Sequence, residues 1–198
     1  MGQHSLLDAD RYALESQIRE CYGRCAYTHK THEKMAERLH ARHQRGKWIN
    51  IVLSALITSG AVSVLFSKGS AWEGLASYAT AALSVLSLIF NAYLKDLDPG
   101  ALAQRHRETA SDMWNVREAY LSLITDILDT KTELENIRNR RDDLQEKLHK
   151  IYHGAPHTDG SAYGKAQDAL KNNEDLTFTD TEIDLMLPVS LRRSRRAG

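Results

Sequence analysis

The sequence predicts an all-α membrane protein, in which a two-helix transmembrane hairpin is joined to long cytoplasmic helices that form a coiled-coil-like stalk. Two uncharged stretches, residues 48–67 and 74–94, lie almost back to back in a chain of which 26% of the residues are charged. As a helix, each stretch can cross the hydrocarbon core of a bilayer, which is roughly 30 Å thick. Apolar residues at heptad-like intervals precede and follow the pair.

The two stretches could also be the buried hairpin of a large soluble protein, because Ser, Thr, Ala and Gly dilute their apolar residues. However, the rest of the chain holds too few apolar residues to surround two such helices. Trp48, Trp72 and Tyr93 lie at the ends of the stretches, where aromatic rings favour the membrane interface. We therefore expect a membrane hairpin with a short external turn at residues 68–73.

Basic residues on either side of the hairpin predict its orientation. The external turn holds Lys68 as its one basic residue. The flanks hold many more: Lys34, Arg38, Arg42, Arg45 and Lys47 before the first span, and Lys95, Arg105 and Arg107 after the second. The positive-inside rule then places both flanks in the cytoplasm, where the two cysteines are expected to be reduced.

The N-terminal flank, residues 1–47, is predicted to be one helix that begins near Ser5 or Asp8 and runs directly into the first span. Its apolar or weakly polar residues recur at alternating intervals of four and three, which is typical of a coiled-coil seam. The seam positions are Leu14, Ile18, Cys21, Cys25, Thr28, His32, Met35 and Leu39. Because several of them are Cys, Thr or His, we expect an adaptable seam.

The second cytoplasmic segment, residues 95–153, begins at a helix break. Asp98-Pro99-Gly100 should end the second span, because proline disfavours helix in the residue before it. One long helix is then predicted over about residues 101–152. Its seam positions are Tyr120, Ile124, Ile127, Lys131, Leu134, Ile137, Arg141, Leu144, Leu148 and Ile151. The two seams are expected to pack antiparallel to each other or against another subunit.

Residues 154–198 are predicted to hold short helices and a basic tail. The sequence His153-Gly154-Ala155-Pro156 should end the stalk, and an amphipathic helix is expected over residues 161–171. Thr179 and Glu182 have the spacing of a capping box, which predicts one more short helix. Four tail arginines could contact anionic lipid headgroups or remain solvated: Arg192, Arg193, Arg195 and Arg196. No aromatic platform accompanies them, so we expect no specific nucleic acid.

Cys21, Cys25, His29 and His32 would share one helix face, and these residue types bind zinc. A single straight helix cannot surround an ion with four ligands, and three of the four coincide with the seam. We therefore interpret them as packing residues and expect no metal or other cofactor. His40 and His43 are interpreted as part of a solvated basic face rather than as a pH sensor. No catalytic set or glycine-rich phosphate loop is present, so an enzyme is not expected.

Polar residues recur along both spans. The second span carries Ser77, Thr80, Ser84, Ser87 and Asn91, and the first carries Asn50, Ser54 and Thr58. Small hydroxyl residues let membrane helices pack closely and form hydrogen bonds across the contact. Alternatively, the stripe lines an aqueous path, which requires several chains because one hairpin cannot enclose a pore. No GxxxG pair occurs in the spans.

Short motifs in a fixed order around the hairpin resemble the SLATT family of bacterial two-transmembrane effectors. The motifs before and within the hairpin are His29-Lys30-Thr31-His32-Glu33-Lys34 and Asn91-Ala92-Tyr93-Leu94-Lys95. Those that follow it are His106-Arg107-Glu108-Thr109-Ala110, Trp114, Arg117-Glu118-Ala119-Tyr120, Ile151-Tyr152-His153-Gly154-Ala155-Pro156-His157-Thr158, Ala162-Tyr163, Thr181-Glu182-Ile183-Asp184 and Leu187-Pro188. The resemblance covers nearly the whole chain.

The resemblance implies a membrane effector of a bacterial anti-phage defence system. Such an effector is expected to form homo-oligomers in the inner membrane, with both termini cytoplasmic. When triggered, it would form a pore or disrupt the membrane and so cause growth arrest or cell death. A sensor protein or a nucleotide second messenger is the implied trigger, and membrane lipid is the other expected partner. The alternative is a membrane-anchored helical scaffold that recruits a soluble partner without conducting ions.

Overall fold

The computed structural model describes residues 2–66, 72–129, 131–189 and 192; the side chains of residues 2–7 and 73 are not described. These residues form six helices and no strand, which confirms the predicted all-α fold. The helices are α1 (Gly2–Phe66), α2 (Glu73–Leu97), α3 (Pro99–Leu128), α4 (Leu134–Gly154), α5 (Gly160–Asn172) and α6 (Asp180–Met186). Most of the turn predicted at residues 68–73, with Lys68, lies outside the described residues.

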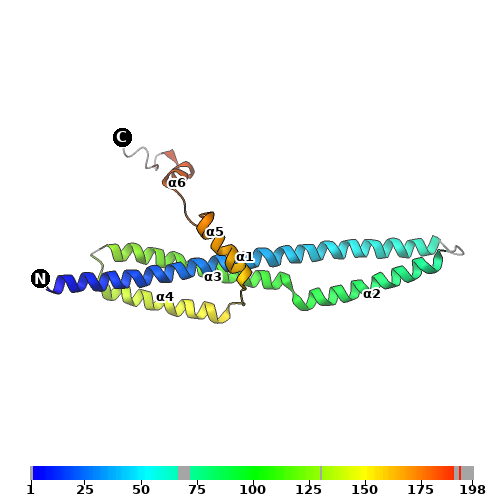
Figure 1. Ribbon diagram of the computed structural model, residues 1–198, viewed down its shortest axis with the longest axis horizontal. Helices are drawn as coiled ribbons and strands as arrows, with labels where there is room; N and C mark the ends of the chain where they lie inside the picture. Colours follow the sequence, from blue (N-terminus) through cyan, green and yellow to red (C-terminus); the bar gives the residue numbers. More distant parts are fainter. Residues whose placement is uncertain (1, 67–71, 130, 190–191, 193–198) are drawn as a thin grey trace.

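α1 is a single helix of 65 residues, about 100 Å long at 1.5 Å per residue. It runs without a break from the polar flank into the first apolar stretch (Figure 1). No proline interrupts this segment of the sequence, so every residue can take part in helical hydrogen bonding. The predicted helix that enters the span is confirmed. Its predicted start near Ser5 or Asp8 is wrong, because the helix already includes Gly2.

α2 returns beside α1, and α3 continues along the other half of α1 (Figure 1). The predicted break between them is confirmed at Asp98, whose φ of 30° lies in the left-handed region. The Asp98 carboxylate accepts a hydrogen bond from the backbone N–H of Ala101 at 3.0 Å and so caps α3. Pro99 is the first residue of α3, where a missing N–H costs no helical hydrogen bond.

The prediction of one helix over residues 101–152 is wrong, because α3 ends at Leu128 and α4 begins at Leu134. Between them, the backbone N–H of Lys131 donates to the Asp129 carboxylate at 3.1 Å, a local turn that competes with helix. The Arg11 guanidinium of α1 donates to the carbonyls of Ile127 and Thr132 at 2.7 and 2.9 Å. These bonds satisfy carbonyl groups at the helix end, and α4 folds back along α3 (Figure 1).

The stalk is therefore a bundle of α1, α3 and α4 around one apolar core. Its buried residues are Leu14, Ile18, Cys25, Val116, Tyr120, Leu123, Ile127, Ile137 and Leu144. The antiparallel packing expected for the two seams is observed between α1 and α3 within one chain. The predicted seam of residues 120–151 is divided between two helices, α3 and α4, that pack on each other.

α5 and α6 follow the bundle in different ways. α5 packs on α1 through three buried alanines, Ala162, Ala166 and Ala169, whose small side chains permit a close approach. α6 projects away from the bundle (Figure 1). Its predicted capping box is present: the backbone N–H of Glu182 donates to the Thr179 hydroxyl, and the backbone N–H of Thr179 donates to the Glu182 carboxylate.

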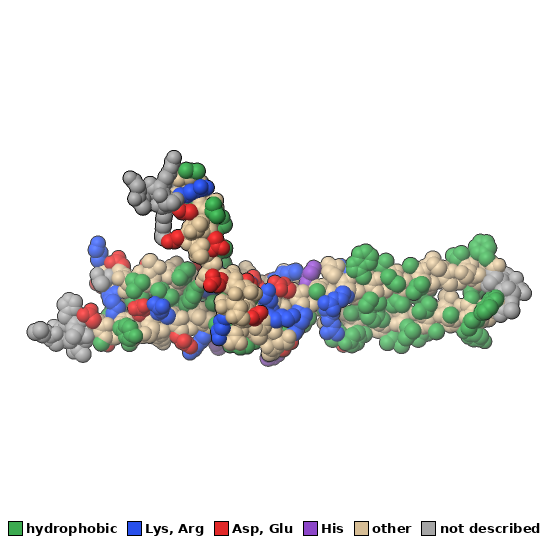
Figure 2. All heavy atoms as spheres, turned by 45° about the horizontal axis from the view of Figure 1, so that its top comes forward, with side chains coloured by type: hydrophobic (Ala, Val, Ile, Leu, Met, Phe, Trp, Pro, Cys, Tyr) green, Lys and Arg blue, Asp and Glu red, His purple; other side chains and the backbone are tan. Residues whose placement is uncertain are grey.

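The hairpin of α1 and α2 has an apolar surface, whereas the stalk has a charged one. Figure 2 shows hydrophobic side chains over the hairpin and Lys, Arg, Asp and Glu over the stalk. Both helices are long and apolar enough to cross a membrane, and apart from the contact between them their most apolar windows are not covered by the rest of the chain. Because a soluble protein would bury these windows in its core, the buried-hairpin alternative does not describe this chain.

Candidate functional site in the hairpin and the stalk

The two hairpin helices meet through residues spaced three and four apart. The contact positions, of which Ser87 is buried and the others are partly buried, are Asn50, Leu53, Ile57, Gly60 and Val64 on α1 and Ala76, Thr80, Leu83, Ser87, Phe90 and Leu94 on α2. This spacing keeps one face of each helix on its partner. The predicted stripe of α2 is thus divided, because Thr80 and Ser87 lie in this contact while Ser77, Ser84 and Asn91 are exposed.

Two glycines determine how closely the hairpin helices pack. A Cβ atom on Gly60 would overlap the Thr80 hydroxyl, and one on Gly46 would come within 2.8 Å of Leu94 Cδ1. Small residues at such positions let membrane helices pack closely. Sequence reasoning missed these two residues because it looked for glycines four apart, whereas Gly46 and Gly60 are separated by two heptads.

Five exposed polar residues of the two helices lie on the same side of the hairpin, whereas the exposed Ser59 and Ser63 of α1 lie on the other side. On α1, Ser54 and Thr58 each follow a contact residue by one position. On α2, the same holds for Ser77, Ser84 and Asn91. The residue after a contact residue is rotated by about 100° around the helix axis from that contact. In an antiparallel pair, this step leads to the same side of the hairpin on both helices. We call this set of five residues the polar flank.

Asn50 and Asn91 join the two helices at the end of the hairpin nearest the stalk. Asn50 Nδ2 donates to Asn91 Oδ1, and Asn91 Nδ2 donates to the Ser87 carbonyl at 2.9 Å. The pair lines a cavity of about 320 Å³ together with Lys47, Lys95 and other residues. Amides in a bilayer normally face protein or water, and here they face each other beside two cations.

Several hydroxyl groups of the hairpin donate hydrogen bonds to carbonyl groups of their own helices. Thr58 Oγ1 donates to the Ser54 carbonyl, and Thr80 and Ser84 donate to the carbonyls of Ala76 and Thr80, all at 2.9 Å. These intrahelical bonds allow a serine or threonine to face lipid. Thr58 and Ser84 of the polar flank can therefore meet lipid, water or another protein surface without an unsatisfied donor.

Histidines from separate motifs meet inside the stalk. His32 Nδ1 of α1 lies 2.9 Å from His106 Nδ1 of α3, and His29 Nδ1 lies 3.3 Å from an Arg117 guanidinium nitrogen. Burial, followed by the nearby His106 and His29, lowers the pKa of His32 to about 4. Burial likewise lowers the pKa of His29 and His106. These three imidazoles are neutral at pH 7.

The residues considered as zinc ligands face the stalk interior. Cys25 is fully buried in the apolar core, and Cys21 packs against that core. Burial, followed by the neighbouring Cys21, raises the pKa of the Cys25 thiol to about 12, which opposes the thiolate form that binds metal. Within the described part of the chain, no three His, Cys, Asp or Glu side chains are grouped so that they could hold a metal ion.

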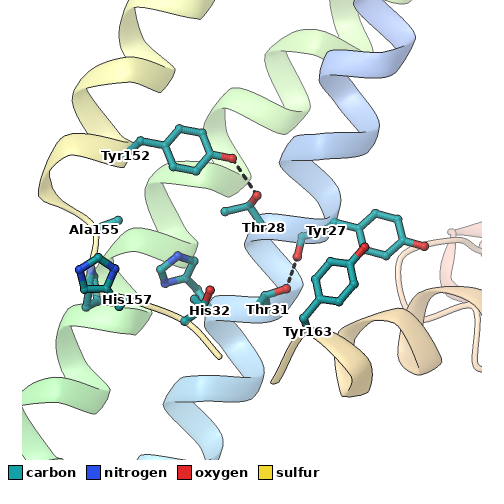
Figure 3. A pocket seen from close by; sticks show the side chains of 10 residues that line it. Tyr27, Thr28, Thr31, His32, Tyr152, Ala155, His157 and Tyr163 are labelled. Carbon is teal, nitrogen blue, oxygen red and sulfur yellow. Dashed lines mark hydrogen bonds between the residues drawn. The ribbon is translucent and has the colours of Figure 1, made fainter. Parts of the chain in front are cut away.

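A cavity in the stalk lies where α1, the end of α4 and the start of α5 come together (Figure 3). The cavity measures about 290 Å³. It is lined by Tyr27, Thr28, Thr31, His32, Tyr152, Ala155, Pro156, His157, Thr158 and Tyr163. We call it the tyrosine pocket. Sequence reasoning did not predict it, although the motifs at residues 29–34, 151–158 and 162–163 all contribute lining residues.

Of the four tail arginines that could contact lipid headgroups, Arg192 lies within the described residues. Arg192 Nε donates to the Leu187 carbonyl at 3.0 Å. Arg193, Arg195 and Arg196 lie outside the described residues. α6, which precedes the tail, projects away from the stalk and lies far from the hairpin (Figure 1).

Two helices that can span a membrane, carried on a long helical stalk, define a two-transmembrane-helix membrane protein. Residues 14–182 match the model of the SMODS and SLOG-associating 2TM effector domain family 4, SLATT_4. The chain belongs to this family of effector domains, which are associated with conflict systems, and the resemblance to SLATT proteins is confirmed. No curated protein and no solved structure matches the chain.

Proposed function

We propose that this protein is a pore-forming effector of a bacterial anti-phage defence system. Several copies assemble in the inner membrane with both termini in the cytoplasm. A sensor protein or a small ligand shifts the assembly from a closed to an open state, because it binds the open state better. The open state dissipates the ion gradients of the infected cell and stops its growth.

The polar flank is the observation that carries this proposal. Polar residues in membrane-spanning segments normally face protein or water, and a hairpin that only anchors a protein has no need to gather them on one side. Here one side carries polar residues on both helices, with the exposed Ile51, Leu65 and Leu88 between or beside them; the polar residues are Ser54, Thr58, Ser77, Ser84 and Asn91. When several hairpins form a ring, such a side can face the central path.

The stalk is open on the same side as the polar flank. α1 is one continuous helix, and its residues Glu33 and Glu37 each follow a buried residue by one position, as Ser54 and Thr58 follow contact residues. They line a groove of about 470 Å³ between α1 and α3. α4 and α5 cover the opposite side of α1, where they form the tyrosine pocket.

An apolar row borders this groove. Trp114, Leu121 and Leu128 recur every seven residues on α3, and their side chains are 50%, 44% and 62% exposed. Each follows a buried α3 residue by one position, which places the row on the open side. Seven-residue spacing suits packing against another helix. A second copy anchored in the same membrane presents its own stalk at the same height, so homo-oligomerisation would cover this row.

The flux experiment compares the two sides of the hairpin. The double variant Ser84→Leu, Asn91→Leu removes polarity from the polar flank. The matched control Ser59→Leu, Ser63→Leu changes two exposed serines that precede contact residues by one position and so lie on the other side. Bacteria that overproduce each protein are tested for entry of a membrane-impermeant dye and for loss of membrane potential.

We expect the wild type and the control to admit dye and the Ser84→Leu, Asn91→Leu variant to admit much less. Equal dye entry by the three proteins would contradict a polar flank that faces water. If dye stays out and the potential holds even for the wild type with infecting phage present, the pore is wrong. The alternative of a membrane-anchored scaffold would then remain, with the stalk as its docking element.

A further inference from the structure

The tyrosine pocket has the form of a ligand site. Three segments that are distant in the sequence enclose it: α1, residues 152–158 after the body of α4, and α5. Thr31 and His32 are buried at its base, whereas Tyr152 and Tyr163 are 46% and 50% exposed at its rim. A ligand could therefore enter between exposed rings and reach fixed polar groups below them.

The rings and hydroxyl groups of the pocket are held by defined contacts (Figure 3). The Tyr152 and Thr28 hydroxyl groups lie 2.8 Å apart and form a hydrogen bond between α4 and α1. Tyr27 and Tyr163 stack with their ring centroids 5.9 Å apart. The Thr31 hydroxyl donates to the Tyr27 carbonyl at 2.7 Å. These contacts position the aromatic faces before any ligand arrives.

The lining is aromatic and hydrogen-bonding but uncharged. Three tyrosines and two histidines supply rings, and three threonines supply hydroxyl groups that both donate and accept. Among the described residues, no carboxylate, ammonium or guanidinium group lines this pocket. A small inorganic ion would lack a counter-charge there. An alkyl chain would offer no hydrogen-bonding group to the polar atoms of the lining.

We infer that the tyrosine pocket binds the base of a nucleotide. A nucleobase is a flat, uncharged ring system whose faces stack on tyrosine and whose edge both donates and accepts hydrogen bonds. Tyr152 and Tyr163 offer exposed ring surface, and His32, Thr31 and His157 offer polar atoms to the edge. The cavity of about 290 Å³ has room for one base with its sugar.

A neighbouring hollow can hold the phosphate end of the same ligand. It has a volume of about 380 Å³ and shares Tyr27, Thr28, Tyr152 and Tyr163 with the tyrosine pocket. It adds Glu20, Gly23 and Arg24. The Arg24 guanidinium is paired with Glu20 at 3.1 Å and is largely exposed, so it can also reach a phosphate group.

Occupancy of the pocket would bear directly on the membrane hairpin. The ligand would touch α1, which continues without interruption to Phe66, and would fix the end of α4 and the start of α5 against it. This coupling rests on the proposed function, because it makes the nucleotide the trigger of the pore. The binding inference itself does not require that the protein conduct ions.

Equilibrium dialysis with the purified full-length protein in detergent tests the inference. The probes are ATP, GTP, adenosine, guanosine and inorganic tripolyphosphate. We expect saturable binding of at least one nucleotide and of its nucleoside, but not of tripolyphosphate. Tyr163→Ala should weaken this binding about tenfold or more, because it removes a stacking ring, and Tyr163→Phe should keep most of it. Arg24→Ala should weaken binding of the nucleotide but not of the nucleoside.

Two controls separate the possible outcomes. Tyr12→Ala removes an exposed tyrosine of α1 far from the pocket and should leave binding unchanged. Thermal unfolding followed by circular dichroism establishes that each variant is folded. Absence of saturable binding by the wild type, or equal affinity of folded wild type and Tyr163→Ala, would overturn the inference. Dye entry without nucleotide binding would contradict this site alone, whereas binding without dye entry would contradict the pore alone.

Discussion

α1 carries polar side chains in both the stalk and the hairpin, but their hydrogen bonds differ. In the stalk, His29 and His32 are buried and contact side chains of α3. In the hairpin, Thr58 is exposed and donates to a carbonyl of its own helix. The stalk contacts hold two helices in one register. Within the described residues, the Thr58 and Ser84 hydroxyl groups make no hydrogen bond between the hairpin helices, so they can change their surroundings without the loss of one; on the same side, Asn91 does bond to the other helix, at Asn50.

The largest expected difference between the two regions concerns apolar residues. Ile18→Ala in the stalk core should lower the free energy of unfolding by about 2–5 kcal/mol, because Ile18 is fully buried and the cavity remains. Ile89→Ala on the exposed surface of α2 should change it by less than about 0.5 kcal/mol. Thermal unfolding in detergent, followed by circular dichroism, measures both. A similar cost at the two sites would contradict the assignment of the core to the stalk.

The next effect in size is a dependence of stalk stability on pH. Burial lowers the pKa of His32 from 6.5 to about 4, so below pH 6.5 the unfolded chain binds a proton that the folded stalk does not. Stability is therefore full above pH 6.5 and falls as the pH drops toward 4, by up to about 3 kcal/mol. His106 acts in the same direction, and Arg38, Arg105 and Asp159 are the charged groups around it.

Thermal unfolding between pH 7 and pH 4.5 measures this dependence. His32→Asn should flatten the profile, because it removes the imidazole whose pKa differs most clearly between the two states. His149→Asn, at an exposed position of α4, is the matched control and should keep the wild-type profile. A stalk that becomes more stable toward pH 4.5 would contradict the buried neutral pair.

A smaller effect is expected at the hairpin contact. Gly60→Ala should destabilise the hairpin by about 1–3 kcal/mol, because the new Cβ overlaps the Thr80 hydroxyl and forces the helices apart. Gly74→Ala is the matched control, since no atom lies within 4 Å of its Cβ position; alanine is there the better helix former. Unfolding in detergent with increasing denaturant compares the two variants. Thr80→Ala should partly restore the Gly60→Ala protein.

Much of this architecture was predictable because its signals are local and periodic. The uncharged stretches, the Asp98-Pro99 break and the Thr179–Glu182 cap each depend on neighbouring residues, and all three are present. The break after Leu128 was missed because Lys131 fits the seven-residue spacing. What ends α3 is a local turn at Asp129 and the Arg11 side chain, which is distant in the sequence.

The tyrosine pocket was not predictable, because it depends on three segments that meet only in the folded chain. Tyr27, Tyr152 and Tyr163 carry no periodic signal that connects them. The polar flank was partly predictable. The spacing identified its residues, but their division between contact and surface required the register of α1 on α2, which Gly60 and Thr80 set.

The smallest expected effect on stability concerns the amide pair of the hairpin. Asn50→Ala should cost only about 0.6 kcal/mol, the average for hydrogen bonds between membrane helices, although Asn50 donates directly to Asn91. Dye entry should change measurably although stability hardly changes. The substitution frees the Asn91 amide and adds space, and both alter the polar flank beside Lys47 and Lys95. Unfolding in detergent and dye entry in cells are compared for the same variant. A large loss of stability with unchanged dye entry would make the pair a structural contact, like those of the stalk, and would remove the difference between the two regions.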